Sequence, residues 1–406
     1  MEKILNFDEL ISNHIGSNRT IKGVKASNLL NVGENYMSDI LRIHLTLRND
    51  TTEEEENKYL IAKLTIENPL IADGTTAKLT KNEYLFYKQI LPAIQDFENN
   101  HSLPVSNFFP KFIAGRLNLN GTDLPDQNAL LILEDLTSEG FKSGDRHVGF
   151  DLNATKLILN DLAKFHAIPL AMRLLNPQQY ETQIKKHCTG LISNTCAGPL
   201  QTSLLMENII TMYKNYQHIQ PKYKIFATKL QKMLEENPKR IWGAKVIDDF
   251  ETLIHCDLWT NNILLKHNDG TAIKSVFLDF QMVETNSCIC DLIFFLVTSV
   301  ELTCLKNNFD TLIRFYYDGL SLNLDKLQCL KREHSYEKFQ EALRKGSYSP
   351  IFQCVFMLLT VITAQKGQHF DQFNIRDIPV EDVPEIAKNR LCFLLQEAFQ
   401  RGWLDA

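Results

Sequence analysis

The chain has 406 residues, enough for two domains or lobes, and its content of 44% hydrophobic and 23% charged residues is ordinary for a folded, water-soluble protein. Its net charge of −6 argues against nucleic acid or an anionic membrane as a partner. The nine cysteines form no C-x2-C pair, which indicates free thiols in a reducing compartment. The start, MEKILNFDEL, lacks the apolar stretch of a signal peptide, and the longest apolar run, near Leu292–Val300, is too short to cross a bilayer. We therefore expect a cytoplasmic protein.

The first third of the sequence predicts a small, mostly antiparallel sheet with one main helix. Its strands are indicated by alternating apolar residues, and the helix by apolar residues at helical spacing. The expected elements, in chain order, are one or two helices in residues 1–30, a strand within 29–47, a strand at 59–64, a helix at 80–97, and strands at 112–117 and 129–133. Pro92 is expected to kink the helix or end it early.

From Phe150 onward the sequence is mostly helical. Asp151 is a plausible N-cap for a helix over Leu152–His166, and helices are expected to about residue 240 and again from Cys290. A loose segment around 134–142 marks the expected boundary. The predicted domains are an N-terminal lobe, residues 1–137, and a helical C-terminal lobe, residues 138–406.

The run HCDLWTNN at 255–262, followed by DFQ at 279–281, carries the clearest chemical signal. Phosphoryl transfer to a hydroxyl needs a group that orients the hydroxyl and accepts its proton, and oxygen ligands for Mg²⁺. Asp257 suits the first role. Asn262 and Asp279 suit the second, because Mg²⁺ prefers hard oxygen ligands.

A lone H-x-D-x4-N pattern also arises by chance, so its context decides. The run lies between the apolar segments 253–254 and 263–265, and the β-rich run 276–278 delivers Asp279 at its end. Two strands flanking a loop would bring Asn262 and Asp279 close together, as a shared metal site requires.

The N-terminal lobe contains candidate residues for binding the phosphates of a nucleotide. Lys63 closes the strand YLIAKL, and Glu83 in the following helix is placed to direct it, as in kinases. Taken singly, each is better explained by a solvated surface position, but the two together, upstream of the H-x-D-x4-N run, favour phosphate binding. The turn at Gly33 has only one glycine; Asn35 and Ser38 could cover phosphates, or the turn is an ordinary β-turn.

The segment LLILEDL is expected to cross between the lobes, where the peptide groups of Glu134, Asp135 and Leu136 would meet adenine. His255 is expected to order the catalytic loop rather than act as an acid or base. Trp259 either lines the acceptor pocket or packs in the core. Asp291 either caps the helix that follows it or braces the loop around His255, and bracing is slightly favoured.

Together these residues resemble the ecdysteroid kinase-like family, which is related to choline and aminoglycoside kinases. The matching pieces are GENYMS at Gly33, IAKL ending at Leu64, NEYLFY at Asn82, LEDLTSEGF at Leu133, LAKFHA at Leu162, HCDLWTNN at His255, DFQ at Asp279 and CDLIFFL at Cys290. The resemblance implies an α+β, bilobal, protein-kinase-like fold with a small antiparallel-sheet N-lobe, one main N-lobe helix and a larger, mostly helical C-lobe. It also implies ATP and Mg²⁺, with Asp257 as base, Asn262 and Asp279 on the metal, and Lys63 with Glu83 on the phosphates. The family usually has glycine where this chain has Cys256, which would be strained if that peptide requires a positive φ.

The sequence therefore favours a kinase that transfers the γ-phosphoryl group of ATP to a hydroxyl of a steroid, such as an ecdysteroid, or of a foreign or dietary alcohol in detoxification. The alternative is a kinase-like protein that binds a ligand or nucleotide without catalysis. A protein kinase is disfavoured because no A-P-E element follows DFQ. The acceptor pocket is expected from residues 175–245 and the C-terminal helices, whose aromatic residues include Tyr213, Tyr216, Phe315, Tyr316 and Tyr317. Aromatic residues at helical spacing more often belong to the core than to a ligand pocket, so none of them is predicted to contact the acceptor.

Overall fold

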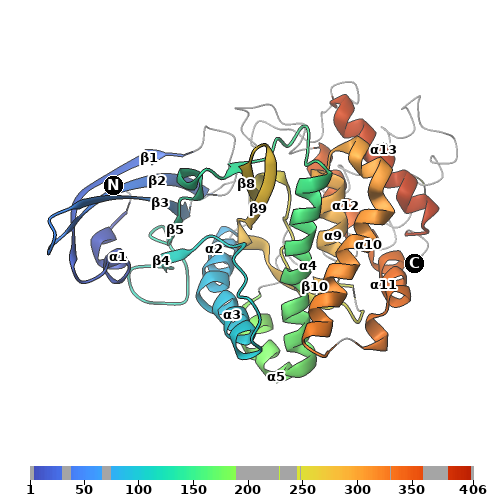
Figure 1. Ribbon diagram of the computed structural model, residues 1–406, viewed down its shortest axis with the longest axis horizontal. Helices are drawn as coiled ribbons and strands as arrows, with labels where there is room; N and C mark the ends of the chain where they lie inside the picture. Colours follow the sequence, from blue (N-terminus) through green and yellow to red (C-terminus); the bar gives the residue numbers. More distant parts are fainter. Residues whose placement is uncertain are drawn as a thin grey trace.

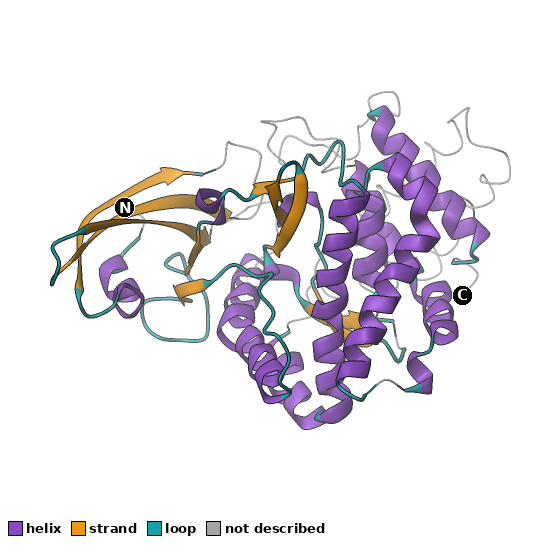
Figure 2. Cartoon of the chain, viewed as in Figure 1, coloured by secondary structure: helices purple, strands orange, loops and turns teal. Residues whose placement is uncertain are grey.

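The computed structural model describes residues 4–29, 38–65, 75–188, 228, 245–246, 248–329, 331–359 and 383–403. The molecule is elongated, with a twisted sheet at one end and a larger helical part at the other (Figure 1). Strands gather at the N-terminal end, and helices fill the rest of the molecule apart from two small sheets (Figure 2).

The N-terminal part is built on a five-stranded antiparallel sheet with the strand order β1-β2-β3-β5-β4. Its elements are α1 (Phe7–Ile15), β1 (Arg19–Asn28), β2 (Ser38–Asn49), β3 (Glu55–Thr65), α2 (Thr75–Leu85), a π-helical turn (Phe86–Ile90), α3 (Leu91–Asn100), β4 (Phe112–Arg116) and β5 (Leu130–Glu134). The predicted strands β2 to β5 are confirmed within a few residues.

The two faces of this sheet differ. Leu41, Ile43 and Leu45 of β2 point to one face, where they form a core with Phe7 and Ile11 of α1. Lys63 stands on the other face of β3, because successive side chains alternate. The sheet thus directs its functional lysine away from its own core.

The prediction of only helices in residues 1–30 is wrong in part, because Arg19–Asn28 form β1. This strand lies at the sheet edge and pairs only with β2, and most of its side chains are exposed or half-buried. A strand with no fully buried face lacks the apolar alternation that identifies a strand in sequence.

The main N-lobe helix runs from Thr75 to Asn100 and does not end at Pro92. The π-helical turn directly before α3 leaves Pro92 in the first turn of the new segment, where a missing amide donor is tolerated. Phe86, Ile90 and Phe97 of this helix belong to the main hydrophobic core, together with residues of the C-terminal helices. The helix therefore joins the sheet to the helical part of the molecule.

The C-terminal part contains long helices around two small sheets, β6-β8-β9 and β10-β7. Its elements are a 3₁₀ helix (Leu136–Glu139), β6 (Lys142–Ser143), α4 (Leu152–Leu175), α5 (Pro177–Gln179), a π-helical turn (Tyr180–Ile184), a 3₁₀ helix (Lys185–His187), β7 (Glu251–Ile254), a 3₁₀ helix (Thr260–Asn262), β8 (Ile263–Asn268), β9 (Thr271–Phe277), a 3₁₀ helix (Phe280–Met282), β10 (Glu284–Ser287), α9 (Ile289–Ser299), α10 (Leu302–Lys326), a 3₁₀ helix (Arg332–His334), α11 (Tyr336–Gly346), α12 (Tyr348–Leu359) and α13 (Glu385–Gln400). The Asp151 side chain accepts a hydrogen bond from the Ala154 amide at 2.8 Å, which confirms the predicted cap of α4.

This arrangement confirms the predicted fold class, an α+β bilobal kinase-like fold with a small antiparallel N-lobe sheet. The expected hairpin around Asp279 is also present, since β8 and β9 pair antiparallel. The domain limits 1–137 and 138–406 stay a prediction. Among the described helices, none combines the length and apolarity needed to cross a membrane.

The aromatic residues named in the segments expected to build the acceptor pocket fall into two groups. Tyr213 and Tyr216 lie outside the described residues. Tyr316 and Tyr317 of α10 are buried in the main core, and Phe315 packs against it. These three therefore have a structural role in the helical part.

Candidate functional site

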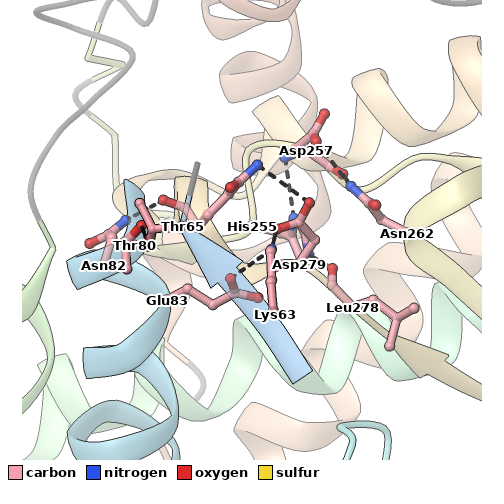
Figure 3. Close-up of polar contacts among 11 residues, drawn as sticks. Lys63, Thr65, Thr80, Asn82, Glu83, His255, Asp257, Asn262, Leu278 and Asp279 are labelled. Carbon is pink, nitrogen blue, oxygen red and sulfur yellow. Dashed lines mark hydrogen bonds and ion pairs between the residues drawn. The ribbon is translucent and has the colours of Figure 1, made fainter. Parts of the chain in front are cut away.

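Lys63 joins two carboxylates from different parts of the chain. Its Nζ lies 2.7 Å from Oε2 of Glu83 on α2 and also contacts Oδ1 of Asp279, which lies two residues after the end of β9 (Figure 3). The side chain of Glu83 is buried, and those of Lys63 and Asp279 are mostly buried. The predicted lysine–glutamate pair is thus present, and it extends to the Asp of DFQ.

The charges around Lys63 do not balance. Burial lowers the pKa of Lys63, but the carboxylates of Asp279 and Glu83 outweigh it and hold this pKa above its ordinary value. Burial, and then the nearby charge of Asp279, raise the pKa of Asp257 well above its usual range. One ammonium group serves three carboxylates, so the site has a deficit of positive charge.

Asp257 and Asn262 are coupled directly. Nδ2 of Asn262 donates to the carbonyl oxygen of Asp257 at 2.8 Å and to its Oδ2 at 2.9 Å. Asn262 ends a 3₁₀ helix just before β8, so the loop closes on itself between these residues. Because the nitrogen faces Asp257, Oδ1 of Asn262 is the atom left to ligate a cation.

The ring of His255 holds the loop from inside. Its Nε2 lies 2.8 Å from the carbonyl oxygen of Leu278, and its Nδ1 accepts a hydrogen bond from the Asp257 amide at 3.2 Å. Burial lowers the pKa of His255, which matches a neutral ring that donates at one nitrogen and accepts at the other. His255 therefore connects Asp257 to the strand that carries Asp279, and its geometry suits orientation rather than proton transfer.

Asp291 braces the loop. Its Oδ2 accepts the His255 amide at 2.6 Å, and its Oδ1 accepts the Cys256 amide at 2.9 Å. His166 of α4 lies 3.1 Å from the same carboxylate. Of the two predicted alternatives, the structure supports bracing.

Cys256 has φ +64°, in the left-handed region that favours glycine. The condition for strain at this position is therefore met. The residue is buried, and its backbone conformation is held by the contacts of its amide and carbonyl groups. Asp279 likewise has a positive φ of +65°. Asp257 thus follows an unusual backbone conformation and Asp279 adopts one, as is common at functional sites.

Helix α2 and the π-helical turn that follows it contact the DFQ segment, and sequence reasoning missed these contacts. Nδ2 of Asn82 donates to the carbonyl oxygens of Gln281 and Val283, each at 2.9 Å. The rings of Phe86 and Phe280 stack at 3.8 Å between centroids. The sequence shows only an asparagine, Asn82, next to Glu83 in a helical pattern. Its burial and its partners, about half the chain away, are seen only in the structure.

The expected hinge follows β5. The amides of Glu134 and Asp135 donate to the carbonyls of Lys111 and Tyr59, at 3.1 and 3.2 Å. The amide of Leu136 donates to no other residue within the described ranges. The Asp135 carboxylate is buried and pairs with Arg42 of β2 at 2.7 Å. The Asp135 side chain therefore has a structural task, and Leu136 offers the free peptide donor.

Of the remaining residues named from the sequence, the structure describes Ser38 and Trp259. Gly33 and Asn35 are outside the described residues. Ser38 begins β2, with its Cα opposite Thr65, near the Lys63 end of β3. Trp259 is buried in the main core. The structure thus brings together Lys63, Glu83, His255, Asp257, Asn262 and Asp279 (Figure 3).

The two proposed ligands, Asn262 and Asp279, fit a divalent cation whose remaining ligands would come from a bound phosphate and water. No group of three or more His, Cys, Asp or Glu side chains is arranged to hold a metal ion in the parts of the chain that the structure describes. Asn262 and Asp279 supply an amide oxygen and a carboxylate, and the deficit of positive charge around them favours a cation. A cation here would need further ligands from phosphate and water.

Comparisons with known proteins agree with the motifs. A model of the ecdysteroid kinase-like family matches residues 32–329. No curated protein shows a significant sequence match. Among solved structures, a choline kinase from Cryptosporidium parvum Iowa II is 11% identical, with a TM-score of 0.44 over 99% of this chain and 95% of that one. An ethanolamine kinase from Plasmodium vivax is 11% identical, with a TM-score of 0.38 over 93% and 84% of the two chains. The GDP complex of a variant of aminoglycoside 2'-phosphotransferase-IIIa is 12% identical, with a TM-score of 0.40 over 98% and 96%.

Proposed function

The chain belongs to the ecdysteroid kinase-like family, and we propose that it is a kinase that uses ATP and Mg²⁺ to phosphorylate a hydroxyl group of a small molecule. The observation that carries this proposal is the convergence of Lys63, Glu83, Asp257, Asn262 and Asp279 from separate elements into one site. A decayed, non-catalytic relative would be expected to have lost one of these groups.

Each residue has a distinct task in this proposal. Lys63, directed by Glu83, binds the phosphates of the nucleotide, and the amide of Leu136 offers a donor to the adenine ring. Asn262 and Asp279 hold Mg²⁺, which when bound neutralises charge on the phosphates. With a cation held by Asn262 and Asp279, Asp257 would more readily take the ionised form that a base needs, because the added positive charge would offset the negative charge that raises its pKa.

Asp257 orients the acceptor hydroxyl and takes its proton. As the acceptor oxygen forms its bond to the γ-phosphorus, the bond from phosphorus to the bridging oxygen of ATP breaks, and ADP leaves. The two hydrogen bonds that Asn262 donates to Asp257 hold this carboxylate in a fixed orientation. Catalysis then rests mainly on positioning and on electrostatic stabilisation.

The acceptor is proposed to be a steroid of the ecdysteroid kind or a foreign or dietary alcohol. The description of the family supports the first, and the second would serve detoxification. All eight cysteines within the described ranges are free thiols, which supports the proposed cytoplasmic location.

The test is a screen for phosphate transfer. Purified protein is incubated with ATP, Mg²⁺ and hydroxylated steroids or plant-type alcohols, and ADP release is measured together with the mass of the acceptor. We expect an acceptor-dependent release of ADP and one phosphorylated product. Nucleotide binding without any transfer across the panel and without ATP hydrolysis would instead favour a kinase-like binding protein.

A further inference from the structure

Cys256, the residue between the catalytic-loop histidine and the proposed base, is held at both of its backbone polar groups. The Cys256 amide donates to Asp291 of α9, and the Cys256 carbonyl accepts a hydrogen bond from Nε2 of Gln353 on α12. Gln353 lies 97 positions along the chain from Cys256 and beyond residue 329, where the match to the family ends. This contact therefore comes from a part of the chain to which the family match assigns no role.

Helix α12 presents a polar face to the loop. Ser349 and Gln353 are one helical turn apart and share a face. The Ser349 side chain hydrogen bonds with the Cys290 thiol, next to Asp291, while Gln353 reaches Cys256. Ile351, Val355 and Leu358 are buried, and α12 packs along α9 (Figure 1). The helix is thus a fixed support from which Gln353 can hold the loop.

The positive φ of Cys256 makes its hydrogen bond with Gln353 important for the loop. A residue other than glycine keeps φ +64° only when its surroundings enforce that conformation. A rotation of the Cys256 peptide would turn the next residue, Asp257, away from the acceptor and from Asn262. Small misplacements of a reacting group are expected to cost large factors in rate.

We propose that Gln353 is a positioning residue for phosphoryl transfer, whose side-chain amide fixes the Cys256 carbonyl and so the direction of Asp257. The proposal rests on the proposed kinase function, and it adds a C-terminal helix to the machinery of the site. A glutamine suits the task because it donates to a carbonyl without placing a charge beside the carboxylates.

Two variants remove the donor in different ways. Gln353→Leu keeps the approximate size of the side chain, and Gln353→Glu keeps its shape but replaces the donor by an acceptor. Gln340→Leu, on the exposed side of α11, is the matched control. Thermal unfolding of all three variants identifies any general loss of folding.

The first measurement is the alkylation of Cys256 by N-ethylmaleimide under native conditions, followed peptide by peptide by mass spectrometry. Cys256 and Cys354 are both buried, so Cys354 on α12 serves as an internal reference. We expect Cys256 to react about tenfold faster in both Gln353 variants, because the loss of one hydrogen bond makes local opening of the loop easier. Cys354 should stay protected. Unchanged protection of Cys256, or an equal rise at Cys354, would overturn the proposal.

The second measurement separates positioning from binding. With the acceptor from the screen, or with water as acceptor, the Gln353 variants should lose kcat by on the order of 100-fold, with KM for ATP nearly unchanged. A parallel change in both constants would contradict a positioning role. If the wild-type protein transfers no phosphate, the proposed function fails; if it does and Cys256 stays protected in the variants, only the role of Gln353 fails.

Discussion

Asn262 donates its side-chain amide to both the carbonyl oxygen and the carboxylate of Asp257, at 2.8 and 2.9 Å. This arrangement joins the residue proposed as base to a residue proposed on the metal. The loop between these two residues closes through this one side chain. The amide oxygen of Asn262 then remains for the cation.

Asp257→Asn should abolish turnover while nucleotide binding stays close to that of the wild type. The variant keeps the size of the side chain but cannot accept a proton, and loss of a positioned base costs roughly 10²- to 10⁴-fold in rate. Steady-state kinetics and titration of Mg·ATP binding by calorimetry would measure the two effects. Full activity in this variant would remove Asp257 from the role of base.

Replacing Cys256 by glycine and by alanine should separate backbone strain from side-chain packing. Both changes delete the buried thiol, but only glycine adopts φ +64° without a steric penalty. The Gly variant should therefore be more stable than the Ala variant, by about 1 kcal/mol in the free energy of unfolding.

The same pair of substitutions at Cys354, inside α12, is the control for this prediction. There glycine should be less stable than alanine by about 1 kcal/mol, because glycine disfavours a helix interior. Urea unfolding measures all four variants. The same ranking at both positions would contradict strain at Cys256.

Glu284 should make stability depend on pH. Burial raises its pKa from 4.5 to about 7, and its hydrogen bonds with Asn286 and Cys256 only partly offset this. Between these pH values the folded protein keeps a proton that the unfolded chain has released, so stability is lost as pH rises from about 4.5 to 7. Glu284→Gln removes this proton exchange.

The expected difference can be measured by urea unfolding at several pH values. The variant should gain stability relative to the wild type by up to about 3 kcal/mol as pH rises across that window. Above pH 7 the difference should level off. A difference that is constant with pH would show that Glu284 titrates normally in the folded protein.

Local patterns in the sequence were enough to predict most of the N-terminal sheet. The alternation Leu41, Ile43, Leu45 marks β2 because one face of this strand is buried and the other is not. Asp151 marks the start of α4 because N-capping is a local interaction. The β8–β9 hairpin follows from adjacent apolar runs. These features depend on residues that are close together in the chain.

The features that could not be predicted depend on distant partners or on missing burial. β1 is an edge strand and carries no clear alternation. Asn82 contacts the DFQ segment 199 positions away, and Gln353 contacts the catalytic loop 97 positions away. A single polar side chain in a helix gives no sign of such a partner. The sequence therefore predicted the supports that lie within its motifs, His255 and Asp291, but not those that come from distant helices, Asn82 and Gln353.

The proposed Mg·ATP site can be tested by thermal unfolding of the protein with ATP, with Mg²⁺ and with both. Binding to the folded state alone raises the midpoint, by about 2 °C or more at saturating ligand. The wild type should show this rise only with both ligands, and Asp279→Ala should lose it. The control Asp269→Ala should keep it, because this exposed aspartate also has a positive φ but lies outside the site. No shift of the wild type in any condition, or the full shift in Asp279→Ala, would contradict the account.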